Sequence, residues 1–241
     1  MKVAAKLDSL TAVSKTNENW LINQYENLHN SVFLVYTKND SIQASGTSFL
    51  VSTDGICVSN YHVFKGMTEG YVKNSDGKWY DIEQILEYNE KTDFIIFKID
   101  LDYSIAEPLK IAKNKIPKIG EKCFAIGNPR MQENTLSEGI VSSIRNEGKT
   151  IQMTAEITHG SSGGPLFNQK GEVIGITSSG LGEANINYAI NIHQLDLKRF
   201  EKNTTSSNAD YIIQENKAYF YDHPNVNNKA SIFLLSGNLV E

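Results

Sequence analysis

Cysteine, proline and long hydrophobic runs are all scarce in this 241-residue sequence, which contains two cysteines and five prolines. Cys57 and Cys123 allow at most one bridge and exclude a disulfide framework, so we expect two reduced thiols buried in strands. Every apolar run falls well short of the roughly 18 residues of a transmembrane helix, and none is predicted. The first ten residues, MKVAAKLDSL, lack the apolar segment of a secretory signal. This predicts a cytoplasmic protein, or a periplasmic or secreted one if a leader has been removed.

Positive charge is also limited. The 23 Lys and Arg residues are outnumbered by 28 Asp and Glu residues, which gives a formal net charge of −5. No arginine-rich block is present, and we interpret the lysines at 110, 113, 115 and 118 as part of a solvated loop. Nucleic acid is therefore not expected as a partner. The hydrophobic fraction of 40 % is enough for a sizeable core and excludes wholesale disorder.

Short β-rich runs separated by turns make up most of the chain. An amphipathic helix is predicted first, over residues 17–29, where Trp20, Leu21, Tyr25 and Leu28 recur at helical spacing. Eleven β-rich runs follow, with almost no helix between them: residues 31–37, 41–52, 56–60, 70–74, 78–86, 93–99, 122–127, 138–144, 150–156, 172–180 and 186–192. This pattern predicts an all-β sandwich or barrels rather than a parallel α/β sheet.

The β-rich pattern divides near residue 108, where lysines and two prolines interrupt the strands, and two six-stranded halves would fit. Residues 193–202 predict one closing helix. We expect a flexible leader over residues 1–16, one domain over residues 17–202, and a linker with a C-terminal extension over residues 203–241. No internal repeat is visible in the sequence.

The hexapeptide GSSGGP, residues 160–165, is the most specific stretch. A nucleophilic serine needs a tight turn that projects its hydroxyl and aims backbone N–H groups at a developing oxyanion. Glycines on both sides of Ser162 permit such a turn. A plain hairpin loop would have the same composition, so the motif alone does not decide between the two.

A serine nucleophile also needs a base, and His62 follows a β-rich run at a place where loops carry function. His159 is three residues before Ser162, which makes a proton relay awkward but allows it to line a pocket. Solvated or capping roles suit the other three histidines, at 29, 193 and 223.

The base in turn needs a carboxylate that fixes its tautomer. Asp93 opens the apolar run DFIIFKI, although a strand-leading aspartate is usually a turn residue. Its competitors at positions 81, 100 and 102 lie in more hydrophilic surroundings. The favoured chain order is therefore His62, Asp93, Ser162, with the serine in the second β-half and the other two in the first.

Six segments in this order resemble chymotrypsin-fold serine peptidases, most closely the bacterial HtrA (DegP/DegS) branch, over roughly residues 30–200. They are SGTSFLVSTDGICVSNYHV, TDFIIFKI, AIGNP, SEGIVSS, EITHGSSGGPLFNQKGEVIGITS and INYAINI. The resemblance implies two six-stranded antiparallel β-barrels with a short N-terminal helix and a closing C-terminal helix. It also implies His62 as general base, Asp93 as its orienting group and Ser162 as nucleophile.

The resemblance further implies an oxyanion hole and a substrate-binding strand. The backbone N–H groups of Gly160 and Ser162 would form the hole, and the strand around Ser178 to Gly180 would accept the substrate as an added β-strand. No cofactor and no metal are implied. The implied partner is a protein or peptide substrate in an extended conformation, and an activating partner or self-association would be compatible with it.

The sequence departs from this family at several positions. Glu156 stands where trypsin has the acid of its specificity pocket, so it either selects Lys or Arg or pairs with a lysine and leaves an aliphatic preference. His159 replaces a residue at the pocket mouth, and Ser48 replaces a glycine of the inner wall. Ser161 stands where zymogens have aspartate, so activation by a new N-terminal amine is not expected.

After residue 202 only 39 residues remain, fewer than a PDZ module needs, although HtrA enzymes usually carry one. The leading hypothesis is thus a serine endopeptidase that acts through an acyl-enzyme. The alternative is a catalytically silent peptidase fold that binds peptides or regulates a partner.

Overall fold

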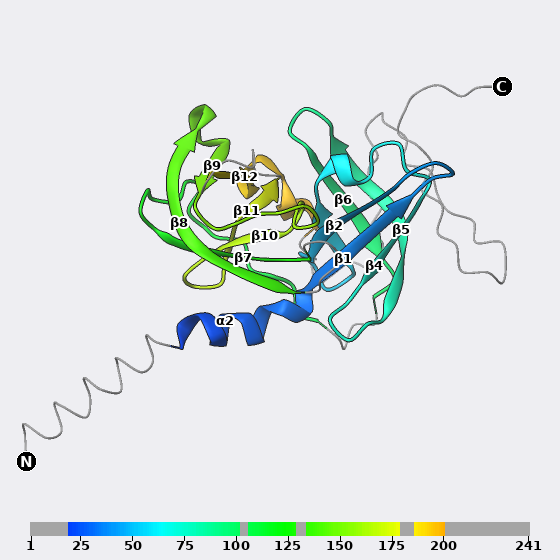
Figure 1. Cartoon of the computed structure of the whole chain (residues 1–241), viewed down its shortest axis with the longest axis horizontal. Coiled ribbons are helices and arrows are strands. Elements are labelled where there is room, and N and C mark those ends of the chain that lie inside the picture. Colours follow the sequence, from blue (N-terminus) through cyan, green and yellow to red (C-terminus); the bar gives the residue numbers. More distant parts are fainter. Residues whose placement is uncertain (1–18, 102–105, 129–133, 179–185, 201–241) are drawn as a thin grey trace, which may run out of the picture.

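The computed structural model describes residues 19–101, 106–128, 134–178 and 186–200, and within them the chain forms two closed antiparallel β-barrels (Figure 1). The first barrel has the strand order β1-β2-β3-β6-β5-β4. Its strands are β1 (Val32–Lys38), β2 (Gln43–Leu50), β3 (Ile56–Ser59), β4 (Glu69–Lys73), β5 (Trp79–Asn89) and β6 (Phe94–Ile99). The predicted six-stranded first half is therefore confirmed.

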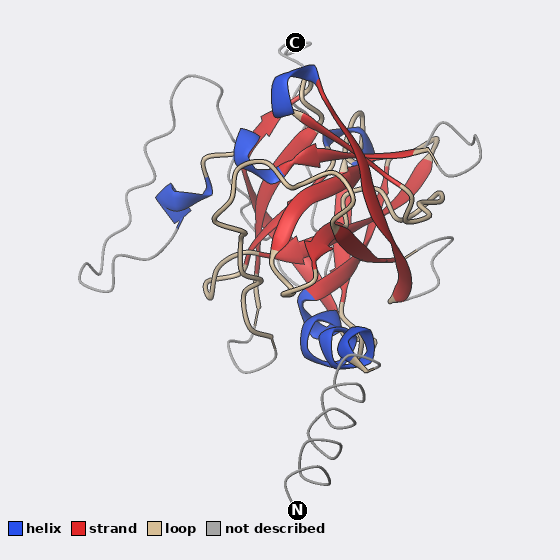
Figure 2. Cartoon of the chain, turned by 90° about the vertical axis from the view of Figure 1, so that its left-hand side faces the viewer, coloured by secondary structure: helices blue, strands red, loops and turns tan. Residues whose placement is uncertain are grey.

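The second barrel has the order β7-β8-β9-β12-β11-β10, which is the same connectivity as in the first. Its strands are β7 (Lys122–Gly127), β8 (Thr135–Arg145), β9 (Thr150–Met153), β10 (Pro165–Asn168), β11 (Val173–Ser178) and β12 (Asn187–Asn191). The two halves thus share a topology that no sequence repeat reveals. Figure 2, turned by 90° from Figure 1, shows how strands dominate the described chain.

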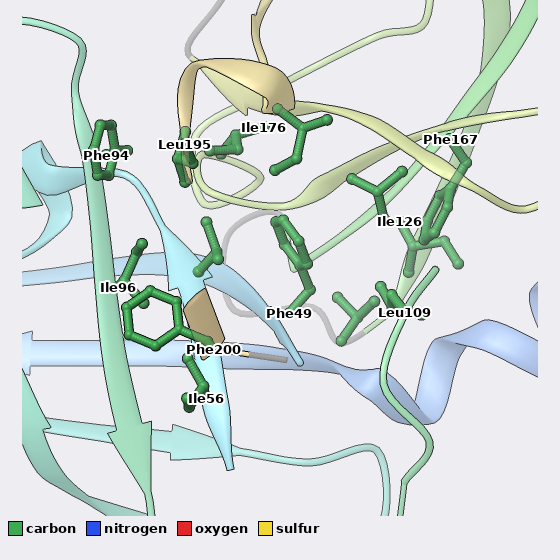
Figure 3. Close-up of a cluster of buried hydrophobic side chains, with 14 of the residues drawn as sticks. Phe49, Ile56, Phe94, Ile96, Leu109, Ile126, Phe167, Ile176, Leu195 and Phe200 are labelled. Carbon is green, nitrogen blue, oxygen red and sulfur yellow. The ribbon is translucent and has the colours of Figure 1, made fainter. Parts of the chain in front are cut away.

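Three hydrophobic clusters stabilise this arrangement, and one of them joins the barrels. It combines Phe49, Ile56 and Ile96 of barrel 1 with Phe167 and Ile176 of barrel 2, and all five side chains are fully buried. Figure 3 shows these side chains facing one another between strands of the two halves. Burial of large apolar side chains contributes about 1.5–3 kcal/mol each, so this cluster stabilises the relative position of the barrels strongly.

Helix α2 (Trp20–Leu28) confirms the amphipathic segment predicted over residues 17–29. Its apolar face packs on the cluster between the barrels, where the Trp20 ring meets Phe124 edge-on at 5.7 Å. The Lys122 ammonium lies 5.6 Å from the centroid of the same indole ring. The helix lies along one side of the second barrel in Figure 1.

Two details differ from the sequence prediction. Strand β10 was not among the predicted runs, because it has four residues, begins with proline and directly follows the GSSGG turn. The predicted closing helix over residues 193–202 consists of two 3₁₀ turns, η5 (Ile192–Gln194) and η6 (Leu197–Phe200). Leu195 separates them, because its extended backbone (φ −99°, ψ 137°) interrupts the helical hydrogen bonds.

Both cysteines are free and buried, Cys57 in β3 and Cys123 in β7, as predicted. Burial raises the pKa of the Cys57 thiol well above its usual value and that of Cys123 to about 12. No helix among the described residues is long and apolar enough to cross a membrane. The predicted leader (1–16) and extension (203–241) lie outside the described residues, so these boundaries stay predictions.

Candidate active site

His62 lies on a short 3₁₀ turn, η2 (Tyr61–Val63), which follows β3 after one residue. The two neighbours of His62 are buried, and the Tyr61 ring stacks on Tyr88 with centroids 5.2 Å apart. Burial raises the pKa of the Tyr61 phenol, and the nearby Glu90 carboxylate adds to this shift. With both neighbours anchored, the His62 side chain projects outward and keeps 44 % of its surface exposed.

Asp93 binds the His62 turn through both its side chain and its backbone. Its Oδ2 lies 2.8 Å from His62 Nδ1, and its Oδ1 accepts the His62 backbone N–H at 2.9 Å. Its carbonyl accepts the Asn60 side-chain amide at 2.8 Å and the Tyr61 N–H at 3.3 Å. Asp93 adopts a left-handed backbone (φ 55°), which aspartate tolerates better than most residues. This backbone conformation turns the carboxylate and the carbonyl of Asp93 toward the same segment, residues 60–62. The carboxylate thereby orients the imidazole of His62.

The segment from residue 160 to 164 forms a tight, buried turn that holds Ser162. Gly160 and Gly163 have φ angles of 97° and 89°, which residues with a side chain rarely adopt. The Ser161 N–H donates to Thr158 O at 2.9 Å, and the Gly163 N–H donates to Thr177 O at 2.8 Å. Only 5 % of Ser162 is exposed. The glycines on both sides of Ser162 therefore have the conformational role that the sequence predicts.

The nucleophile turn of barrel 2 lies directly against the His62 turn of barrel 1. A methyl group built on Gly163 would come within 2.2 Å of Ser59 Oγ and 2.9 Å of the Asn60 N atom, immediately before η2. The Thr47 N–H of β2 donates to Ser162 O at 2.8 Å. Residues about 100 positions apart in the sequence thus meet between the barrels. The hydrogen bonds of the described residues include none between Ser162 and His62, and such bonds are often long in unliganded enzymes.

Two backbone N–H groups in the turn have no hydrogen-bond acceptor among the described residues, those of Gly160 and Ser162. Both residues are buried, although buried N–H groups are nearly always paired. The neighbouring N–H groups at 161, 163 and 164 all donate within the protein. The unpaired donors are therefore the two that the resemblance assigns to an oxyanion hole.

The remaining predicted site residues have different surroundings. Glu156 and His159 are both exposed, and Glu156 makes no ion pair with a described residue. Ser178 ends β11 and pairs with Tyr188 of β12. Gly180 lies outside the described residues. Ser48 is fully buried in β2, and its hydroxyl has no hydrogen-bond partner among the residues that the structure describes.

Two other histidines have structural contacts. His29 Nδ1 lies 2.9 Å from Tyr25 O at the end of α2, in keeping with the capping role considered for it. His193 Nε2 lies 2.8 Å from Ala112 O. His223 lies outside the described residues. Within the part of the chain that the structure describes, no group of three or more metal-binding side chains is arranged to hold an ion.

Sequence reasoning missed three buried polar residues around the nucleophile turn: Thr47, Asn128 and Thr177. The Thr47 hydroxyl donates to Gly160 O at 2.8 Å and accepts the Asn128 N–H at 2.9 Å. The Thr177 hydroxyl donates to Ser161 O at 2.7 Å. All three stand inside segments that carry the resemblance, but only their position against the nucleophile turn reveals these contacts.

Two barrels with a histidine–aspartate pair on one and a glycine-rich serine turn on the other define the trypsin-like class of folds. The profile of the trypsin-like peptidase domain matches residues 46–176, more than half of the chain. This chain belongs to the trypsin-like peptidase family, which confirms the resemblance stated from its motifs.

Individual proteins agree with this membership. The chain is 38 % identical over 167 residues to the serine protease HTRA1A of Danio rerio, covering 65 % of this chain and 34 % of that protein. It is 34 % identical over 171 residues to the anti-sigma-I factor RsgI9 of Acetivibrio thermocellus, covering 69 % and 24 % respectively. It thus spans only about a quarter to a third of these curated relatives.

A solved structure supports the same placement. The serine endoprotease from Yersinia pestis superposes with a TM-score of 0.65 at 28 % sequence identity. The match covers 71 % of this chain and 62 % of that one. The similarity therefore extends across most of the two barrels.

Proposed function

We propose that this chain is a serine endopeptidase that hydrolyses peptide bonds in extended polypeptide segments, with Ser162 as nucleophile, His62 as general base and Asp93 as its orienting group. The observation that carries the proposal is the two-point contact of the Asp93 carboxylate with His62 at 2.8 and 2.9 Å, beside a turn that holds Ser162. A carboxylate on Nδ1 leaves Nε2 of the imidazole free to accept a proton.

The reaction follows from these roles. Ser162 Oγ attacks the carbonyl carbon of the substrate while its proton passes to His62 Nε2. The C–N bond then breaks, the amine leaves with that proton, and Ser162 remains as an ester. A water molecule, deprotonated by His62, attacks the ester, and the carboxylic acid departs as the proton returns to Ser162. The imidazolium formed in each half-reaction is stabilised by Asp93.

The negative charge on the carbonyl oxygen needs donors that are in place before the reaction. The unpaired N–H groups of Gly160 and Ser162 supply two in a water-poor environment. One such donor contributes about 3 kcal/mol of transition-state stabilisation. These N–H groups would therefore account for a substantial part of the rate.

Specificity would be set beside the turn. We expect the backbone around Ser178 and Gly180 to pair with an extended substrate strand, which favours unfolded or loop segments. Glu156 is exposed and makes no ion pair with a described residue, which favours recognition of Lys or Arg at the cleaved position over an aliphatic preference. Cleavage of a peptide library tests this point, because a profile without enrichment of Lys or Arg excludes it.

A fluorophosphonate probe tests the function itself. Ser162 Oγ should displace fluoride from phosphorus and become covalently labelled, while its proton passes to His62. Mass spectrometry should locate the label on Ser162, and Ser162→Ala should not react. Ser45→Ala, at a half-buried serine of β2 that pairs with Tyr36, is the matched control and should label normally. Labelling at other serines, or none, contradicts the proposal.

A second candidate is a catalytically silent peptidase fold that binds peptides or regulates a partner. The similarity to a protein named as an anti-sigma-I factor favours it, because that name denotes regulation rather than hydrolysis. Experiments with unfolded casein distinguish the two candidate functions. The peptidase should cleave it with loss of activity in Ser162→Ala, whereas the silent module should bind it equally well with or without the hydroxyl.

A further inference from the structure

We infer that Thr47 and Thr177 are positioning residues that hold the nucleophile turn in its reactive form, one from each barrel. This inference rests on the proposed peptidase function. Thr47 lies on β2 of barrel 1 and Thr177 on β11 of barrel 2. Their exposed fractions are 0 and 1 %. Together they bind three successive carbonyl oxygens of the turn, those of Gly160, Ser161 and Ser162.

The Thr177 contact orients one of the two unpaired donors directly. Its hydroxyl lies 2.7 Å from Ser161 O, and this carbonyl also accepts the Gly164 N–H at 3.1 Å. The peptide bond between Ser161 and Ser162 is trans, so its N–H points opposite to its C=O. With the carbonyl held toward Thr177, the Ser162 N–H is directed away from barrel 2 and stays unpaired.

Thr47 fixes the peptide plane on the other side of the turn. Its hydroxyl donates to Gly160 O at 2.8 Å, while the N–H of the same peptide donates to Thr158 O at 2.9 Å. Two hydrogen bonds at opposite ends of this plane restrain its rotation, and through the backbone angles of Gly160, which include a left-handed φ, they restrain the direction of the Gly160 N–H. The Thr47 backbone N–H adds a bond to Ser162 O at 2.8 Å.

A hydrogen bond from Asn128 leaves the single hydroxyl proton of Thr47 available for Gly160 O. The Asn128 backbone N–H donates to Thr47 Oγ1 at 2.9 Å, so that oxygen is an acceptor there and its hydrogen is free for Gly160 O. The Asn128 side chain in turn accepts the Asn134 N–H at 2.9 Å. Thr47 therefore joins β2, the end of β7 and the nucleophile turn in one buried network.

Isosteric variants test this inference. Thr47→Val and Thr177→Val keep the shape of each side chain and remove its hydroxyl. With labelled casein as substrate, each should lower kcat about ten- to a hundredfold, since loss of a whole oxyanion donor costs about a hundred- to a thousandfold. KM should change by less than about twofold, because the N–H groups act on the transition state. The rate of fluorophosphonate labelling should fall in parallel.

Serine variants and a matched control separate positioning from general stability. Thr47→Ser and Thr177→Ser keep the hydroxyl and should keep the wild-type kcat. Ser31→Ala removes another buried hydroxyl bond, 2.6 Å to Glu107 O, outside the site, and should leave kcat per folded molecule unchanged. Folded fractions are measured by thermal denaturation of each variant.

Each outcome has a defined meaning. Valine variants with wild-type kcat, serine variants with reduced kcat, or a valine pair that does not fold at all would each overturn the inference. If one valine variant folds, it decides by itself, because the two hydroxyls belong to different barrels. A wild-type protein that neither labels nor cleaves overturns the proposed function, and the positioning role with it.

Discussion

The two barrels have the same strand connectivity, yet they contribute different kinds of group to the candidate site. Barrel 1 supplies ionisable side chains, His62 and Asp93, which are partly exposed and held by one another. Barrel 2 supplies a buried backbone turn with a serine hydroxyl and two N–H groups that no described residue accepts. Duplicated topology therefore does not imply duplicated chemistry, because the chemistry lies in the turns between strands.

The interiors of the barrels differ as well. The core of barrel 1 combines aliphatic side chains with four aromatic rings, those of Phe33, Phe64, Tyr80 and Phe97. Barrel 2 is filled mainly by small or aliphatic side chains, including four alanines. The largest buried side chains of barrel 1 are therefore aromatic rings, whereas those of barrel 2 are isoleucine, leucine and methionine.

The largest effect is expected where barrel 1 orients its base. Asp93→Asn should lower kcat about 10⁴-fold, because an amide cannot accept from both the His62 backbone and its ring, and the imidazole is left in the wrong tautomer. Stability should change little, since asparagine also tolerates the left-handed backbone. Asp40→Asn, at an exposed hairpin position, is the control for kcat. A loss of less than tenfold in Asp93→Asn would show that Asp93 does not orient the base.

Removal of one ring from barrel 1 should cost more stability than a trimmed aliphatic residue in barrel 2. Phe97→Ala should lower the free energy of unfolding by about 3–5 kcal/mol, because a fully buried ring leaves a cavity. Ile151→Val, which removes one methyl group from the core of barrel 2, should cost about 0.5–1.5 kcal/mol. Urea denaturation of both variants measures these values. Equal losses would contradict the contrast between the two interiors.

The contact between the barrels can be broken at Gly163. Gly163→Ala should destabilise the protein by about 2–5 kcal/mol, for two reasons. The new methyl group would lie 2.2 Å from both Ser59 Oγ and Thr47 O, and alanine would be strained in the left-handed backbone conformation of this position. Gly66→Ala is the matched control, since Gly66 has φ +77° but nothing within 4 Å of an added methyl group. It should cost only the strain, about 1–2 kcal/mol. Thermal denaturation compares the two, and equal shifts would mean that the barrels adjust freely.

The smallest effect is a pH dependence from the buried thiol of barrel 2. An unfolded cysteine titrates near 9.0, whereas burial raises the pKa of Cys123 in the folded protein to about 12. Between these values the folded state holds a proton that the unfolded state releases, so stability is full below pH 9 and falls as the pH rises. The slope from this thiol is at most about 1.4 kcal/mol per pH unit.

Urea denaturation of wild type and Cys123→Ala at pH 8, 9 and 10 isolates this contribution. The variant should lose less stability than wild type over the alkaline steps, although its stability at pH 8 is lower from lost packing. Cys57 of barrel 1 is shifted in the same direction for the same reason, so Cys57→Ala should show the same change in slope. Parallel pH profiles in all three proteins would contradict the assignment.

Much of the architecture could be predicted from local patterns. Alternating apolar runs between turn residues located eleven of the twelve described strands, and the helical spacing of Trp20, Leu21, Tyr25 and Leu28 located α2. Strand β10 was missed, because four residues that start with proline carry too little periodicity. The end of the described chain forms two 3₁₀ turns rather than one helix, because Leu195 packs in the core with an extended backbone.

For the candidate site, the sequence supplied residue types and their order, which sufficed to select His62, Asp93 and Ser162. It did not show that Asp93 binds both the backbone and the ring of His62, since that depends on a left-handed φ. It also gave no indication of the roles inferred for Thr47 and Thr177. Their hydroxyls become informative only when a turn more than a dozen residues away is packed against them.

The class of fold and the chemical groups available could be inferred from the order of amino acids alone, because strand periodicity, turn glycines and motif order are local properties of the chain. The folded arrangement was needed to establish which N–H groups have no acceptor in the described part of the chain, which hydroxyls bind the nucleophile turn and which side chains fill each barrel. These depend on contacts between residues far apart in the chain, and such contacts form only when the two barrels close and pack against each other.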